Sequence, residues 1–69
     1  MKEDVGAKFK ICRTSLGLSQ RDVAAKLGVA QPVYQRFEKG IYECSYAQLV
    51  ALADIFDVSI DYLLGRKNY

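Results

Sequence analysis

Apolar residues recur along the chain in short helical patterns that are separated by brief polar or glycine breaks. The first pattern runs at steps of four, three and four residues through Val5, Phe9, Cys12 and Leu16. This spacing places the four side chains on one face of a helix. The first helix is therefore predicted to start with Asp4 as its cap and to end at Gly17.

A second helix is predicted to follow directly, because Ser19 and Asp22 have the spacing of an N-terminal capping motif. An acid at the third helical position also suits the helix dipole. Gly28 is the predicted end of this helix. Its expected inner face consists of Val23, Ala24 and Leu27.

A third helix is predicted from near Gln31 to the glycine at position 40. Pro32 falls in its first turn, where the missing N–H group costs no hydrogen bond. The apolar side chains on this segment are Val33, Tyr34 and Phe37.

Two more helices complete the pattern. Ser45 and Gln48 form a capping box ahead of a stripe made of Leu49, Leu52, Ala53 and Phe56. Ser59 is the predicted cap of a short fifth helix that ends at Gly65 and carries Ile60, Leu63 and Leu64. Since β-branched residues nowhere alternate over the length of a strand, the sequence predicts an all-α fold of five helices.

Residues 20–39 have the organisation of a helix-turn-helix. Only a few residues around Gly28 join the second and third helices, which is too short a connection for them to lie antiparallel. A glycine turn of this length suits a steep crossing of two helices. The small residues Ala24 and Gly28 are expected at the point where they cross.

The third helix has a polar face opposite its apolar side chains. At about 100° per residue, this face gathers Gln31, Pro32, Gln35, Arg36 and Lys39. Glutamine and arginine are suited to bidentate contacts with adenine and guanine in the major groove. On chemistry alone, the face is either a base-reading surface or an ordinary solvated helix face.

Composition fits one small globular domain. The chain has 69 residues, 51% of them hydrophobic, and a net charge of +2. It is predicted to form a single domain over residues 1–69, with a core of about 5–65 and a short tail over 66–69. The high apolar content argues against disorder, and no apolar run is long enough for a membrane span or a signal peptide. A cytoplasmic protein is expected.

Charge is distributed unevenly. Residues 2–39 carry eight basic and four acidic side chains, whereas residues 40–64 carry four acidic and no basic ones. The pattern predicts either an anion-facing half beside a neutral or partner-facing half, or ordinary solvated surface.

No catalytic, cofactor-binding or metal-binding residue is predicted. The sequence has no histidine, and its two cysteines, Cys12 and Cys44, do not form a Cys-x-x-Cys pair. It also has no glycine-rich phosphate loop. Both thiols are expected to be free, with Cys12 a small core residue and Cys44 in a loop where it could be exposed.

Three ordered segments resemble the Cro and repressor type of helix-turn-helix, the XRE-like family. They are LSQRDVAAKLGV at 18–29, QPVYQRFEKG at 31–40 and SIDYLLG at 59–65. The similarity covers nearly the whole chain, from about Val5 to Gly65. It implies a lambda-repressor-like DNA-binding fold whose third helix reads DNA.

The resemblance implies roles for individual residues. Base-reading positions correspond to Gln31, Pro32 and Arg36, with Gln35 beside them. Gln20 matches a position that contacts phosphate and braces the recognition helix, and phosphate contacts are also expected from Arg21, Lys39 and Lys10. Arg13 and Glu38 match a buried ion pair between the first and third helices.

Some positions depart from the family pattern. Ala30 stands where a serine or threonine cap is usual, and Tyr34 replaces an aliphatic residue, so its hydroxyl needs a partner or access to solvent. Ile41, Tyr42 and Glu43 fill a loop that often carries basic phosphate contacts, which puts those side-chain contacts in doubt.

The sequence therefore predicts a transcriptional regulator, a Cro-like repressor that acts by operator occupancy and is encoded by a bacterium or phage. A homodimer on a pseudo-palindromic double-stranded DNA operator is expected, with Tyr62 and Tyr69 at the dimer surface. At this size, no ligand-sensing domain is expected. The alternative is an antitoxin-like or regulatory module that uses the same fold to bind another protein.

Overall fold

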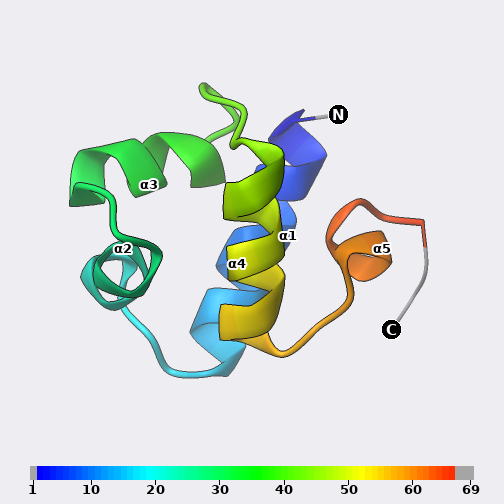
Figure 1. Cartoon of the computed structure of the whole chain (residues 1–69), viewed down its shortest axis with the longest axis horizontal. Coiled ribbons are helices and arrows are strands. Elements are labelled where there is room, and N and C mark those ends of the chain that lie inside the picture. Colours follow the sequence, from blue (N-terminus) through cyan, green and yellow to red (C-terminus); the bar gives the residue numbers. More distant parts are fainter. Residues whose placement is uncertain (1, 67–69) are drawn as a thin grey trace.

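The computed structural model describes residues 2–66 and contains five helices and no strand in that range (Figure 1). The helices are α1 (Lys2–Ser15), α2 (Gln20–Leu27), α3 (Gln31–Glu38), α4 (Tyr46–Phe56) and α5 (Ile60–Leu63). The predicted all-α, five-helix fold is thus confirmed. No helix among these residues is both long and apolar enough to cross a membrane.

Serine caps begin three of the helices, as the sequence predicts. The Asp22 amide donates to Ser19 Oγ at 2.9 Å, and the Ser19 amide donates back to Asp22 Oδ2 at 2.9 Å. Ser45 and Gln48 make the same reciprocal pair at 3.1 and 2.8 Å. At α5 the Ser59 hydroxyl oxygen accepts a hydrogen bond from the backbone amide of the third helical residue. These local bonds fix where α2, α4 and α5 start.

Two predicted details of α1 are wrong, the Asp4 cap and the place of Leu16 on the apolar stripe, whereas Gly17 ends the helix as predicted. The helix already includes Lys2, so Asp4 lies inside it and does not cap it. Leu16 lies beyond the end of the helix and is 51% exposed, although the spacing places it on the apolar stripe. The reason is a Schellman motif: Gly17 is left-handed (φ 71°), and the Leu18 amide donates to the Arg13 carbonyl at 3.1 Å. The chain leaves the helix there, and Leu18 packs against the core instead.

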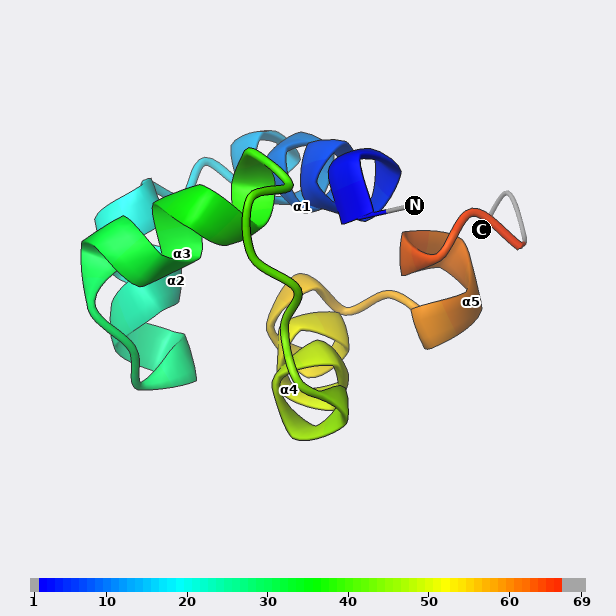
Figure 2. The ribbon, with the colours of Figure 1, turned by 90° about the horizontal axis from the view of Figure 1, so that it is seen from above.

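The core is formed where α3 packs on α1 and α2, with α4 beneath them and α5 at one end (Figures 1 and 2). Its fully buried large side chains are Phe9, Val23, Tyr34, Leu52 and Leu63. Cys12 is buried as predicted, and both cysteines are free thiols. Cys44 is half-buried and so is less accessible than its loop position suggests.

In Figure 1, α2 is seen end-on while α3 lies across the view, so the two helices cross steeply. Ala24 is buried at 2% exposure and allows close packing. The expectation that Gly28 also provides a small contact is wrong, because a side chain added there meets no atom within 4 Å. Gly28 is needed for its left-handed φ of 80°, which ends α2 and starts the turn.

Gly6 has a packing role that the sequence reasoning missed. It is buried within α1, where a methyl group would overlap the carbonyl oxygen of Phe37 and lie 2.5 Å from that of Glu38. The backbone of α1 therefore contacts the last turn of α3 directly. An isolated glycine inside a helical pattern was the available signal, since it weakens a helix unless packing requires it.

Candidate nucleic-acid interface

The polar face of α3 points away from the core. Gln31, Pro32 and Arg36 are exposed, and Gln35 is half-buried beside them. Lys39 is exposed directly after the helix, while Tyr34 and Phe37 are buried on the opposite side. The helix thus presents two glutamine amides and a guanidinium on one surface, the groups that make bidentate contacts with base edges.

The first turn of α3 begins without a side-chain cap. Ala30 is the cap residue, and its side chain cannot accept a hydrogen bond. Backbone N–H groups at such a helix start are oriented for an anion such as phosphate.

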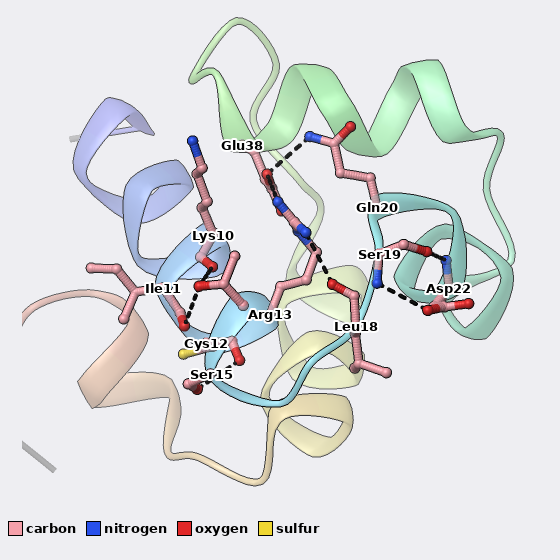
Figure 3. A network of polar contacts seen from close by, with 11 residues as sticks. Lys10, Ile11, Cys12, Arg13, Ser15, Leu18, Ser19, Gln20, Asp22 and Glu38 are labelled. Carbon is pink, nitrogen blue, oxygen red and sulfur yellow. Dashed lines mark hydrogen bonds and ion pairs between the residues drawn. The ribbon is translucent and has the colours of Figure 1, made fainter.

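A network of hydrogen bonds fixes the other end of α3 to α1 and α2 (Figure 3). Arg13 Nε donates to Glu38 Oε2 at 2.6 Å and Arg13 Nη2 to Oε1 at 3.2 Å, which makes a bidentate pair. Gln20 Nε2 donates to Glu38 Oε1 at 3.0 Å, and Arg13 Nη1 donates to the Leu18 carbonyl at 3.0 Å. One carboxylate therefore joins three helices.

Glu38 is held in its ionised form although its side chain is only 3% exposed. Burial alone raises the pKa of this carboxyl group. The hydrogen bonds from Arg13 and Gln20, together with the positive charge of Arg13, outweigh burial and lower its pKa below the ordinary value. The ion pair is consequently intact at neutral pH.

Unlike the polar groups of Arg13, Gln20 and Glu38, the buried hydroxyl of Tyr34 makes no hydrogen bond to the residues that the structure describes. It has no hydrogen-bond partner of acceptable geometry in residues 2–66, and it does not reach solvent. The expectation that the hydroxyl has either a hydrogen-bond partner or access to solvent is therefore wrong. Burial raises the pKa of Tyr34, and the nearby Glu38 carboxylate acts in the same direction.

Tyr34→Phe is expected to leave the free energy of unfolding unchanged or to raise it by up to about 1 kcal/mol, because a buried hydroxyl without a partner costs about 1–3 kcal/mol. The aromatic ring, which packs edge-on against Phe37 with centroids 6.5 Å apart, is retained. Urea denaturation of both proteins measures the difference. A loss of more than 1 kcal/mol would show that the hydroxyl makes a favourable contact.

The remaining predicted residues lie on several elements. Arg21 is exposed near the start of α2, and Lys10 is exposed on α1, where its side chain extends on the same side as Gln20 and Glu38 (Figure 3). Tyr62 is half-buried on α5, with Lys8 Nζ 4.6 Å from its ring centroid. Tyr69 lies outside the described residues.

Comparison with known proteins assigns the fold to a family. A family model described as helix-turn-helix matches residues 9–63, which include α2, α3, α4 and α5. The chain belongs to the XRE-like helix-turn-helix family.

Relatives in this family are transcriptional regulators by name. The HTH-type regulator YqaE of Bacillus subtilis is 44% identical over 61 residues, 87% of this chain and 53% of that protein. The SPbeta prophage-derived regulator YonR of the same organism is 41% identical over 59 residues, 86% of this chain and 55% of that protein. The chain thus spans about half the length of these curated relatives.

A solved structure shows the same architecture. The restriction-modification controller protein C.AhdI from Aeromonas hydrophila superposes with a TM-score of 0.82 at 26% identity, covering 88% of this chain and 92% of that one. The similarity confirms the predicted fold class.

Proposed function

We propose that this chain is the sequence-specific DNA-binding module of a transcriptional regulator, with α3 as its recognition helix. The observation that carries the proposal is the exposed face of Gln31, Pro32 and Arg36 on a helix that Glu38 fixes to α1 and α2. The names of the relatives support the same function.

Each predicted residue has a role in this proposal. Arg36, Gln31 and Gln35 contact base edges in the major groove, with Pro32 packed beside them. Gln20, Arg21, Lys10 and Lys39 contact phosphate and set the register of the protein on the duplex. Gln20 has a second role, because its amide also braces Glu38.

We further propose that the protein acts in the cytoplasm as a Cro-like repressor, bound to a pseudo-palindromic operator as a homodimer. Two recognition helices about 34 Å apart then read successive major grooves. The segment 40–64, which has no basic residue, suits contact with a second copy, since it does not attract DNA. A groove of about 400 Å³ between α1 and α5, lined in part by Leu63, Leu64 and the 54% exposed Ile11, extends this proposed contact onto α1.

A salt titration of duplex binding tests the proposal. The logarithm of the affinity is expected to fall with the logarithm of salt concentration, with a slope of about 0.9 for each phosphate contacted. Absence of binding to any member of a random duplex pool at about 50 mM salt would overturn the proposal and favour a protein partner instead.

Arg36→Ala and Lys39→Ala are expected to have different effects on DNA binding. Loss of the arginine should cost about 1–3 kcal/mol on the selected operator and relax preference at one base pair. Loss of the lysine should weaken binding to all sequences alike, because phosphate carries no sequence information. Affinities for a selected duplex and for random duplexes give the comparison. Equal losses on both kinds of duplex for Arg36→Ala would contradict its base-reading role.

A further inference from the structure

Arg36 has an aromatic neighbour in the loop that follows α3. The carbon at the centre of its guanidinium lies over the Tyr42 ring, 5.5 Å from the ring centroid. The ring is 46% exposed although it is large and apolar. We propose that Tyr42 is a positioning residue that holds the Arg36 guanidinium in place for base recognition. This inference rests on the proposed DNA-binding function.

The end of α3 brings the ring to this position. Gly40 is left-handed (φ 74°), so the chain turns back over the last turn of the helix. The amides of Ile41 and Tyr42 then both donate to the carbonyl oxygen of Arg36, at 3.0 and 3.3 Å. Tyr42 thus contacts Arg36 twice, through its backbone amide and through its ring. The hydrogen bonds that end α3 therefore also place the Tyr42 ring beside the Arg36 guanidinium.

The contact suits a side chain that must still bind a base. A guanidinium over an aromatic face is attracted by the ring electrons without using its N–H donors. Arg36 Nη1 also donates to the Pro32 carbonyl at 3.3 Å, a second contact that limits its rotamers. Less conformational freedom is then lost when the side chain binds DNA, so a pre-positioned arginine binds more tightly.

Arg36 and Arg13 differ in what surrounds their charge. Arg13 is committed to the Glu38 carboxylate, whereas Arg36 forms no ion pair with any of the side chains that the structure describes, those of residues 4–66. An aromatic partner thus orients Arg36 without neutralising it, which leaves its charge available for guanine. The loop that in the family often carries basic phosphate contacts serves the recognition helix here.

The test compares Tyr42→Leu, which removes the aromatic face, with Tyr42→Phe, which keeps it. Tyr46→Leu is the matched control, because Tyr46 is a 77% exposed aromatic residue at the start of α4. Binding is measured on a duplex selected by the wild-type protein and on versions altered at single base pairs. Tyr42→Leu is expected to weaken binding to the selected duplex roughly two- to fivefold and to reduce discrimination at the base pair that depends on Arg36. Tyr42→Phe and Tyr46→Leu should bind like the wild type.

Three binding results would overturn the inference. One is an equal loss of affinity for selected and random duplexes in Tyr42→Leu. Another is that Tyr42→Leu lowers the affinity of the Arg36→Ala protein as much as it lowers that of the wild type. The third is a loss for Tyr42→Phe as large as that for Tyr42→Leu. Thermal denaturation of each variant separates these effects from unfolding.

NMR of the free protein provides a test without DNA. The resonances of the Arg36 side-chain protons should move in Tyr42→Leu and stay in place in Tyr46→Leu, because the Tyr42 ring current is lost only in the first. No movement would show that the contact is absent and would overturn the inference while leaving the proposed function intact. A protein that binds no duplex would overturn the proposed function, and the role of Tyr42 with it, even if the resonances moved.

Discussion

Glu38→Ala is expected to lower the free energy of unfolding by about 3–5 kcal/mol, the usual cost of removing one partner from a buried ion pair. The cost arises because Arg13 keeps its charge but loses both hydrogen bonds to the carboxylate, at 2.6 and 3.2 Å. The Gln20 amide loses its acceptor at the same time. Since the Arg13 side chain is 12% exposed and can recover some hydration, the loss should fall toward the lower end of the range.

This loss is comparable to the whole stability expected of a domain this small, roughly 3–5 kcal/mol. Glu38→Ala can therefore be largely unfolded at room temperature, and Glu38→Gln supplies a second measurement, because an amide oxygen still accepts hydrogen bonds. Urea denaturation followed by circular dichroism gives the values. The matched control is Glu43→Ala at an exposed glutamate, which should change stability by less than about 0.5 kcal/mol.

A double variant separates the cost of a stranded charge from the value of the pair. Arg13→Met combined with Glu38→Leu removes both charges and keeps apolar bulk, so it should be far more stable than Glu38→Ala. A double variant as unstable as Glu38→Ala, or a loss below 1 kcal/mol in Glu38→Ala, would contradict this account of the network.

The same network predicts how stability depends on pH. Because the folded pKa of Glu38 is lower than its unfolded pKa, the ionised group contributes stability above the unfolded value of about 4.3. That contribution is lost as pH falls through the folded pKa. The stability difference between the wild type and Glu38→Gln should therefore shrink on acidification below about pH 4.3. A difference that stays constant there would exclude this linkage.

The sequence predicted those parts of the fold that depend on local chemistry. Ser19 and Ser45 cap helices because their partners lie three residues away, and Gly17, Gly28 and Gly40 end helices because they adopt left-handed backbone. Such signals are complete within a few residues. The exposed face of α3 was predictable for the same reason, since helical periodicity alone separates it from Tyr34 and Phe37.

Features that depend on tertiary placement were not predictable from spacing. Leu16 has the spacing of the apolar stripe, but α1 ends at Ser15, so Leu16 is not part of the helix. The hydroxyl of Tyr34 is buried because its ring fills the core, which no local rule foresees. The contact between Tyr42 and Arg36 was not predictable from spacing either, because it depends on how the chain turns after α3.

Gly6→Ala is expected to lower the free energy of unfolding, although helix propensity alone would favour alanine. In an isolated helix alanine is more favourable than glycine by about 0.5–1 kcal/mol. Here the added methyl group overlaps the Phe37 carbonyl oxygen and approaches that of Glu38 to 2.5 Å. These are backbone atoms, so no side-chain rotation relieves the overlap. A net loss of about 2–3 kcal/mol is expected, the upper part of the range for overpacking.

The measurement pairs this substitution with Ala7→Gly, at the exposed neighbouring position of α1. That variant should lose only the helix propensity of alanine, about 0.5–1 kcal/mol. If Gly6→Ala were neutral or stabilising, α1 would not lie against α3 as closely as the structure shows. If α3 is the recognition helix, as proposed, the contact also couples Gly6 to DNA binding, because the displaced carbonyl groups belong to the turn that carries Glu38 and precedes Lys39. A Gly6→Ala protein that remains folded should therefore bind the selected operator more weakly than Ala7→Gly, although neither residue reaches the exposed face of α3.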